Sequence, residues 1–507
     1  MALTQHTLTQ HTLNAVAMGI DTHHEPVAYM RQNCHICRSE GFVANTRVLL
    51  RTEKNALIVT LNVVRNDKLS PNEIGLSDIA FKQLQCIEGQ KISISHAPIV
   101  TSLSYVRKKI FGSELTEKEI TNIIKDISKH NYSDIEIASF LSACAGNRMS
   151  EAEIVYLTQA MVSCGKKLTW GNRKKIFDKH CIGGLPGNRT TPLVVSIASA
   201  AGLIIPKTSS RAITSPAGTA DTMESLANVN LDMNQIKNVV AKTGACLAWG
   251  GAVNLSPADD MLIRIERALN IDGEGQLIAS VLSKKIAAGS THVIIDIPVG
   301  DTAKVRSKKD AARLAELFTN VGNACHIKVR CLITDGSKPI GAGIGPSEEA
   351  KDILAVLACS ENAPQDLRER ALFLTANLFD MNDGLGINAG IDLATSILDS
   401  GQALCQFNNI ILAQGEPKTL REASHKHTET SESSGVLLVI DNRKLARLAK
   451  LAGAPFSLNS GLRLHVNVGS HIAQGTQLFT LFSESHGEMA YALDYYQDNT
   501  DIFQFKD

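Results

Sequence analysis

Residues 178–193 read DKHCIGGLPGNRTTPL, and residues 207–226 read KTSSRAITSPAGTADTMESL. Each stretch is a loop rich in glycine and hydroxyl side chains that leads into a predicted helix. In the first loop, Gly183, Gly184 and Gly187 let backbone N–H groups approach a ligand closely. A helix N-terminus carries partial positive charge, which favours phosphate. The two stretches therefore predict one anion-binding site built from two loops.

Both loops also carry hydroxyl and cationic side chains that could bind an anion. Thr190 and Thr191 stand just before Pro192, a favourable first residue of a helix. The second loop carries hydroxyls around Gly218, namely Ser209, Ser210, Ser215 and Thr219. The cationic or titratable groups are Lys179, His180 and Arg211. Either loop alone is also consistent with an ordinary capped turn, but together they favour an anion site in which Lys179 faces the ligand.

Strand and helix candidates alternate after the two loops. The candidate strands are residues 246–254, 293–299 and 327–334, and helical patterns include 309–322 and 347–360. Such alternation predicts a mostly parallel sheet with crossover helices. Ligands of such sheets bind beyond the carboxyl ends of the strands, where both loops would lie. The run GAGIGP at 341–346 is a poor dinucleotide loop, because its third glycine comes too soon, and it predicts a turn instead.

We therefore expect a multidomain α/β protein. Its predicted parts are a disordered tail at 1–14, an N-terminal β-rich domain at 15–99, a helical lobe at 100–176 and 257–288, a central mostly parallel α/β domain with the phosphate-binding loops at 177–256 and 289–430, and a C-terminal α+β domain at 431–507. The last part is similar to the barrel-sandwich shape of cofactor carriers. Residues 455–505 contain no lysine that could take a cofactor, which excludes a carrier.

Short sequence patterns support this division into domains. Runs rich in β-branched residues at 48–50, 56–64 and 91–95 predict strands. Helices of the lobe begin at capping boxes, which pair a hydroxyl with a carboxylate three residues later: Thr116 with Glu119, Ser133 with Glu136, and Ser150 with Glu153. Gly165 predicts a left-handed end of the third helix. The polar segment SHKHTETSESSG at 424–435 predicts an exposed loop or linker.

Composition limits the classes of function. The 507 residues are 44% hydrophobic and 20% charged with zero formal net charge, as in a soluble globular chain. Nucleic acid and anionic membranes are not expected as partners, because they require a basic surface. Eleven scattered cysteines suggest reduced thiols in the cytoplasm. Cys34-His35-Ile36-Cys37 is only half of a zinc site, so we expect ordinary thiols and no metal.

The first loop resembles the Lys-His-Ser-Thr-Gly-Gly signature of the thymidine and pyrimidine-nucleoside phosphorylases, and the second resembles their Ser-Gly-Arg and Thr-Gly-Gly-Thr segment. The variants PGNRTT and SSRAITSPAGTAD are most similar to the branch shared by archaeal AMP phosphorylases and their bacterial relatives. The resemblance covers the chain from residue 100 onward. It implies that thymidine and phosphate give thymine and 2-deoxyribose 1-phosphate, with phosphate as a substrate and no cofactor, in a homodimer or larger homo-oligomer.

The resemblance also implies residue roles. Phosphate would be held by Lys179, Gly184, Thr191, Ser209, Ser210 and Thr219. The base or nucleotide would contact Arg211, Ala212, Ile213, Thr214, Ser215, Arg264, Ser280, Lys284 and Lys304, with Arg267 as the alternative to Arg264. His180 would protonate or polarise a base carbonyl, and Asp272 would donate a proton or else cap a helix. Cys181 replaces the family serine, which weakens one donor, and a neighbouring lysine could favour its thiolate.

Two alternatives remain open. The first is an AMP phosphorylase that yields a free base and ribose 1,5-bisphosphate. A nucleotide brings a second dianion, for which Arg189, Arg211 and Lys304 are candidate partners. The second alternative is a nucleotide-binding regulator without turnover, which the retained Lys179 and His180 argue against.

Overall fold

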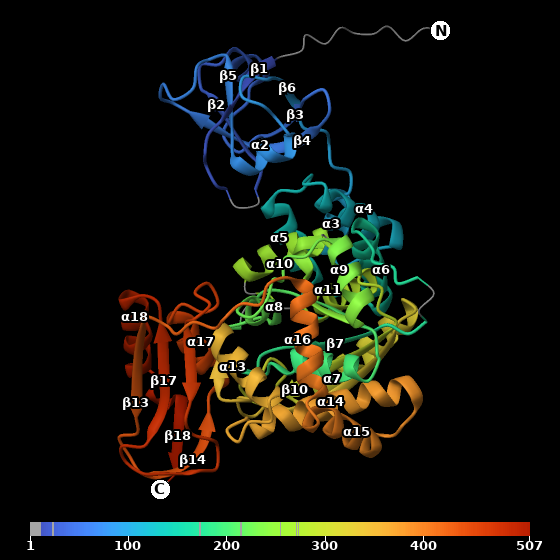
Figure 1. Ribbon diagram of the computed structural model, residues 1–507. Helices are drawn as coiled ribbons and strands as arrows, with labels where there is room; N and C mark the ends of the chain where they lie inside the picture. The colour runs from blue at the N-terminus through green and yellow to red at the C-terminus, as the bar shows by residue number, and fades with distance from the viewer. Residues whose placement is uncertain are drawn as a thin grey trace. The chain divides into compact units, whose positions relative to one another are not determined.

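The computed structural model describes residues 12–506, apart from 23–24, 172–173, 213–214, 254, 270 and 272. The chain divides into two compact units, Met1–Ala143 and Cys144–Asp507 (Figure 1). This boundary divides the predicted helical lobe between the units. Among the described helices, none combines the length and apolar character needed to cross a lipid bilayer.

A closed barrel begins the first unit, with the strand order β1-β5-β2-β4-β3-β6. The strands are β1 (Thr12–Ala17), β2 (Val27–Arg31), β3 (Arg47–Arg51), β4 (Ala56–Val64), β5 (Glu73–Leu76) and β6 (Lys91–His96), with the short helices α1 (His35–Glu40) and α2 (Asp78–Leu84). The three predicted strand runs are confirmed. The predicted tail is wrong at residues 12–14, because Leu13 is buried in the barrel core and holds β1 in the sheet.

Cys34 and Cys37 lie at the start of α1, and both are buried in the core of the barrel. A hydrogen bond from Cys37 lowers the pKa of Cys34 to about 6. The same contact, together with burial, raises the pKa of Cys37. All eleven cysteines fall in the described part of the chain, and none forms a disulfide bond.

The helices that follow are α3 (Leu103–Ile110), α4 (Glu117–Ser128) and α5 (Asp134–Cys144), and α6 (Glu151–Cys164) opens the second unit. All three predicted capping boxes are present, with Glu119, Glu136 and Glu153 accepting from the backbone N–H of their hydroxyl partners. Gly165 is not left-handed; its φ is −103°. The chain leaves α6 in an extended conformation, which allows the Leu168 N–H to bond the Ala287 carbonyl.

Two parallel sheets form the centre of the second unit, where the alternating pattern predicted one mostly parallel sheet. One has the order β11-β10-β7 and the other pairs β8 with β9. The strands are β7 (Phe177–Cys181), β8 (Ile205–Ser209), β9 (Ala245–Trp249), β10 (His292–Val299) and β11 (Lys328–Asp335). β9 is shorter than predicted, because a 3₁₀ turn at Gly250–Val253 follows it.

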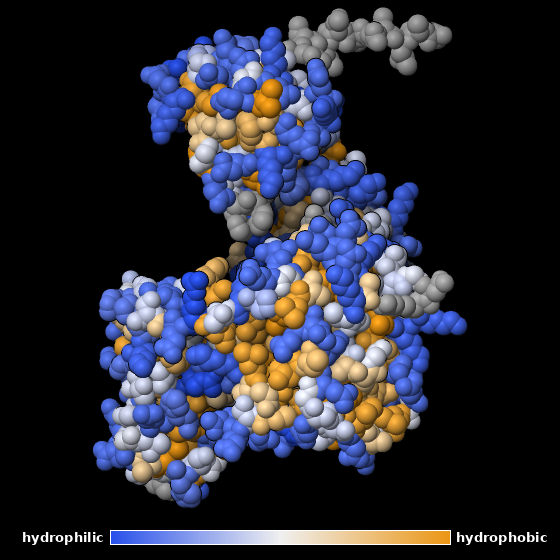
Figure 2. All heavy atoms as spheres, in the orientation of Figure 1, coloured by the Kyte–Doolittle hydropathy of each residue, from blue (hydrophilic) through white to orange (hydrophobic). Residues whose placement is uncertain are grey.

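Helices pack around these sheets (Figure 1). They are α7 (Thr190–Ala200), α8 (Thr219–Glu224), α9 (Met233–Thr243), α10 (Pro257–Leu269), α11 (Glu274–Ala287), α12 (Lys308–Ala324), α13 (Pro346–Leu357), α14 (Gln365–Asp383), α15 (Ile387–Asp399) and α16 (Gln402–Gln414). The largest hydrophobic core joins α7 to α13–α16, and ten consecutive residues of α7, residues 190–199, are buried. Figure 2 shows hydrophobic residues gathered over α16, where Leu412 is 61% exposed.

The C-terminal part contains two antiparallel sheets, ordered β12-β15-β17-β13 and β16-β14-β18. Its elements are β12 (Gly343–Ile344), β13 (His425–Thr430), β14 (Gly435–Ile440), α17 (Asn442–Leu451), β15 (Gly461–Leu464), β16 (His471–Ile472), β17 (Gln477–Ser483), α18 (His486–Gln497), a 3₁₀ turn at Thr500–Ile502 and β18 (Phe503–Lys506). The loop predicted at 424–435 is wrong at residues 425–430, where β13 pairs with β17 as a polar edge strand. The predicted boundary at 431 is therefore too late. The run at 341–346 forms β12 and the turn into α13, as expected.

Candidate functional site

The two glycine-rich loops lie where β7 and β8 end and where α7 and α8 begin. Gly184 has φ +82°, and a Cβ there would lie 2.4 Å from the backbone N of Lys304. A Cβ on Gly218 would lie 2.6 Å from the backbone N of Ala212. These close approaches explain why glycine is required at both positions. They also bring Gly184 and Lys304, which are far apart in sequence, to one place.

Lys179 lies beneath the N-terminus of α7. Its Nζ donates to Thr190 Oγ1 at 2.7 Å and reaches Thr191 Oγ1 at 3.5 Å. The residue is fully buried, and burial lowers its pKa. The expectation that Lys179 faces an open ligand site is therefore wrong for this structure. Its ammonium group instead lies under the first turn of α7, where it positions the hydroxyls of Thr190 and Thr191.

A buried charge cluster lies directly behind this lysine. The carboxylate of Asp178 contacts Lys285 Nζ at 2.8 Å and Lys207 Nζ at 3.7 Å, and all three residues are buried. Burial and the neighbouring ammonium of Lys285 hold the pKa of Lys207 well below its usual range. The sequence analysis missed this cluster. The only available signal was position in the sequence: Asp178 adjoins Lys179, Lys285 adjoins Lys284, and Lys207 lies two residues before Ser209.

The second loop is organised by Asp221. Its Oδ2 accepts from the backbone N–H groups of Ala212 at 2.7 Å and Gly218 at 2.9 Å. Arg211 pairs with Asp221 and Glu224, and its guanidinium lies 4.8 Å from the centre of the Trp249 ring. The predicted nucleotide contact Arg211 is thus also a brace of the loop.

Some of the predicted loop hydroxyls form hydrogen bonds within the protein, and others make none to the described residues and could bind a ligand. Ser215 Oγ donates to the Ala217 carbonyl at 2.9 Å, so it supports the turn. Ser209 Oγ is enclosed and has no hydrogen-bond partner among the described residues. Buried hydroxyls in proteins are normally paired, so an unpaired one at a glycine-rich loop is a group that a ligand can satisfy. Ser210 is exposed beside it.

Arg189 joins the two loops. Its Nε lies 2.7 Å from Glu349 Oε2, and its other nitrogens donate to Thr219 Oγ1 at 3.0 Å and the Ala217 carbonyl at 2.7 Å. The guanidinium is therefore committed to protein groups, which corrects its proposed role as a partner for a nucleotide phosphate. It acts as a fixed internal cation that orients the Thr219 hydroxyl.

Three of the predicted base contacts, Arg264, Ser280 and Lys284, lie on α10 and α11. Ser280 and Lys284 share one face of α11, and Lys284 Nζ forms an ion pair with buried Asp259 at 2.5 Å. Burial opposes the charge of Lys284, but the Asp259 carboxylate outweighs it and raises the lysine pKa. Arg267 donates to the Ala212 carbonyl at 2.7 Å, while Arg264 is half-buried one turn earlier. Three predicted site residues lie outside the described residues: Ile213, Thr214 and Asp272.

His180 and Cys181 end β7, and burial shifts the pKa of both side chains. Burial, followed by the ammonium groups of Lys285 and Lys207, holds the pKa of His180 well below its usual value. The imidazole is therefore neutral near pH 7, so it can polarise a carbonyl as a hydrogen-bond donor but does not carry a spare proton. Burial and the nearby Asp296 raise the pKa of Cys181 to about 12, which corrects the suggested thiolate.

The Asp259–Lys284 pair makes a testable prediction. An Asp259→Asn variant removes the carboxylate that forms the ion pair with Lys284, which should lower the lysine pKa. Lys284 should then react about tenfold faster with an amine-directed acylating reagent near pH 8, read by peptide mass spectrometry. An Asp259→Glu variant keeps the charge and should react like the parent. Equal reactivity in all three proteins would contradict the assigned pairing.

Comparisons with known proteins agree with this architecture. The helical bundle domain of a glycosyl transferase family matches residues 103–165, and the a/b domain of the same family matches residues 173–404. A protein of Hahella chejuensis named "Putative thymidine phosphorylase" is 51% identical, over 95% of each chain. A protein of Acidovorax sp. named "Putative thymidine phosphorylase 2" is 50% identical, over 98% of this chain and 96% of its own.

One solved structure shows the same fold at low sequence identity. Anthranilate phosphoribosyltransferase from Thermus thermophilus superposes with a TM-score of 0.51 at 18% identity, covering 61% of this chain and 98% of its own. The helical and α/β domains found in these comparisons agree with the multidomain α/β prediction. Membership of a family does not assign roles to individual residues, so those roles rest on the contacts and distances described above.

Proposed function

This chain belongs to the thymidine phosphorylase family of glycosyl transferases and is a pentosyltransferase with nucleoside phosphorylase-type activity, and on that premise we propose that its substrates are pyrimidine nucleosides. Thymidine and inorganic phosphate would give thymine and 2-deoxyribose 1-phosphate. The observation that carries this proposal is the enclosed, unpaired hydroxyl of Ser209 at a loop joined to a second glycine-rich loop.

Phosphate would lie between the two loops. The proposed donors are the hydroxyls of Thr191, Ser209, Ser210 and Thr219 and the backbone N–H of Gly184, above the charge of Lys179. Hydrogen bonds to a charged group contribute roughly 1.5–3 kcal/mol each. The attack of phosphate on the anomeric carbon passes through an oxocarbenium-like state, so fixed dipoles and orientation supply most of the catalysis. No metal or cofactor is needed for this chemistry.

The base would be held on the α11 side. Ser280, whose hydroxyl makes no hydrogen bond to the described residues, and Lys284 would contact the ring. His180 would donate a hydrogen bond from its neutral ring to a base carbonyl, which stabilises charge on the departing base. Asp272 stays the predicted proton donor. The homo-oligomer and the cytoplasmic location also stay predictions.

AMP is the second candidate substrate. The backbone of Lys304 lies against Gly184 in the first loop, which provides a cation near the proposed phosphate position for a second dianion. Arg211 is the other candidate, although two carboxylates already engage it. These features support a nucleotide less directly than the loops support phosphate.

A substrate panel with orthophosphate tests both candidates. We expect phosphate-dependent release of free base from thymidine or uridine. If free base is released from AMP alone, the substrate is the nucleotide and not a pyrimidine nucleoside. Binding without any release of base would favour a regulator without turnover.

If AMP is cleaved, replacing Arg211 and Lys304 together by alanine should lower the kcat/KM for AMP about thirtyfold or more, with a much smaller loss for thymidine. Equal losses would assign both cations to the common phosphate position.

A further inference from the structure

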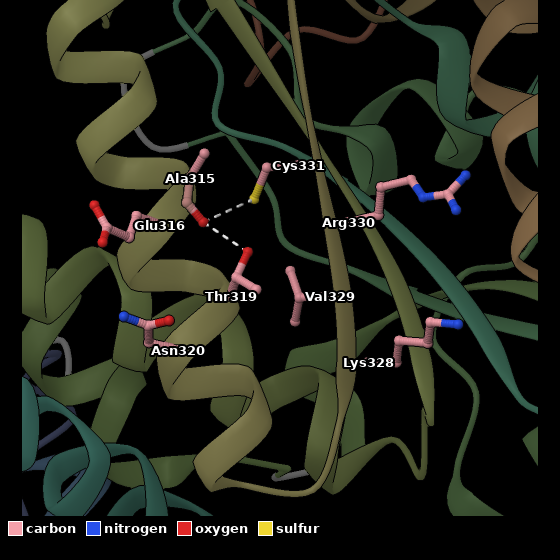
Figure 3. A pocket seen from close by; sticks show the side chains of 8 residues that line it. All are labelled: Ala315, Glu316, Thr319, Asn320, Lys328, Val329, Arg330 and Cys331. Carbon is pink, nitrogen blue, oxygen red and sulfur yellow. Dashed lines mark hydrogen bonds between the residues drawn. The ribbon is translucent and has the colours of Figure 1, made fainter.

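A second cavity lies at the carboxyl end of α8, the end opposite Thr219, and we call it the α8 cavity. Its volume is about 420 Å³. The lining comes from four segments of the second unit: Glu224, Ser225, Ser347, Lys418, Thr419, Leu420, Arg421, Leu458 and Asn459. A larger hollow of about 430 Å³ between α12 and β11 is open and separated from β7 by β10 (Figure 3).

The α8 cavity carries net positive charge. Lys418 Nζ donates to the Glu224 carbonyl at 2.9 Å, which fixes the ammonium at the cavity while leaving further N–H donors. Arg421 is exposed and makes no hydrogen bond or ion pair with the described residues. The one carboxylate in the lining belongs to Glu224, which pairs with Arg211, a cation that it shares with Asp221. Two cations without a free acid among the lining residues favour an anionic ligand.

The remaining walls are hydroxyl and apolar, and they are already formed. Ser225 is 7% exposed, and its hydroxyl has no hydrogen-bond partner among the described residues. Leu420 and Leu458 supply apolar surface. Ser347 fixes one wall, because its N–H bonds the Leu458 carbonyl at 3.0 Å and its hydroxyl reaches Asn459 at 3.1 Å. A preformed pocket loses little conformational freedom when it binds.

We propose that the α8 cavity binds a small phosphomonoester with an apolar body, distinct from the phosphate that reacts at the two loops. The phosphate group would bind Arg421 and Lys418, and the body would pack on Leu420 and Leu458. The volume is within the range of small-ligand sites, roughly 300–1,000 Å³. This site does not depend on which nucleoside the enzyme cleaves.

The position of the cavity links it to the phosphate loops. Glu224 lines the cavity and also pairs with Arg211 of the second loop. The same short helix begins at Thr219, whose hydroxyl is oriented by Arg189. A phosphomonoester in the cavity would therefore lie beside a residue that also holds the second loop.

Binding of 1-naphthyl phosphate to the full-length protein tests this proposal by calorimetry. Saturating orthophosphate is present throughout, so that the loops are filled. We expect one binding site per chain, weakened about tenfold or more when Lys418 and Arg421 are both changed to glutamate. The matched control is Lys426→Glu, an exposed lysine on neighbouring β13, which should leave the affinity unchanged.

Three results would overturn the α8 cavity as a phosphomonoester site. The first is unchanged affinity in the double variant, with an unchanged thermal unfolding curve showing that it is folded. The second is equal binding of 1-naphthol, which lacks the phosphate. The third is loss of binding in Ser209→Ala or Lys284→Ala, which would place the probe at the reaction site. An Arg421→Gln variant, which removes charge without reversing it, should give an intermediate affinity.

Discussion

A Lys179→Met variant is expected to lose at least about a hundredfold in kcat/KM for phosphate-dependent base release. The buried ammonium lies 2.7 Å from Thr190 Oγ1 beneath the helix start at which phosphate would bind. Removing a cation that stabilises a dianion costs about 3 kcal/mol of transition-state binding, which corresponds to this factor. Methionine has nearly the same length, so the change removes charge without opening a large cavity. Steady-state kinetics with phosphate varied measure the loss.

Lys175→Met is the matched control for this experiment. Lys175 is exposed and precedes β7 by two residues, so its substitution should leave turnover within a factor of about two. Thermal unfolding of both variants separates lost chemistry from lost folding, because Lys179 is fully buried. Near-normal turnover in a folded Lys179→Met protein would remove this lysine from the phosphate site.

An Asp178→Asn variant is expected to destabilise the protein by about 3–5 kcal/mol, because it leaves two buried lysines without their carboxylate. Lys285 Nζ lies 2.8 Å and Lys207 Nζ 3.7 Å from that carboxylate. Urea unfolding followed by tryptophan fluorescence measures the change. The loss should be largest near neutral pH and smaller at alkaline pH. This is because Lys207 has a lowered pKa and loses its proton at a lower pH than an exposed lysine, so that a neutral Lys207 no longer needs the carboxylate.

A compensating variant tests the cause of this destabilisation. Combining Asp178→Asn with Lys285→Met removes one of the two uncompensated ammonium groups, so it should recover part of the lost stability. An exposed pair provides the control: Asp501→Asn near Lys444 should leave the urea midpoint nearly unchanged. If Asp178→Asn unfolds at the parent urea concentration, or if the double variant is no more stable than the single one, the charge cluster does not stabilise the fold.

Local sequence signals were enough to predict the two loops and their helix starts. Gly184 and Gly218 are needed because backbone atoms lie within 3 Å of the place that a Cβ would take, and a helix follows each loop. The capping boxes were equally visible, because all of their partners lie within three residues. Such contacts are encoded in one short stretch, so a single sequence is sufficient to find them.

Long-range pairs could not be predicted in this way. Asp178 meets Lys285 across more than a hundred residues, and Arg189 meets Glu349 across 160. Each residue is ordinary on its own element, and only packing shows its partner. Arg189 therefore looked like a ligand for a nucleotide until its three contacts were known. The polar strand β13 was missed for a related reason: its sequence lacks apolar alternation, and β17 supplies its hydrogen bonds.

The two-residue strand β12 prevents the C-terminal part from being a detachable module. Gly343 and Ile344 belong to the central chain, yet they pair with Arg463 and Leu462 of β15. Arg463 also neutralises Glu348 and Asp352 at the start of α13, directly after the turn that packs on Gly187 of the first loop. A shortened chain ending before residue 425 would expose one strand edge and remove the cation that Glu348 and Asp352 share beside that turn. Protein engineers should therefore add fusion partners at the chain ends and leave this junction intact.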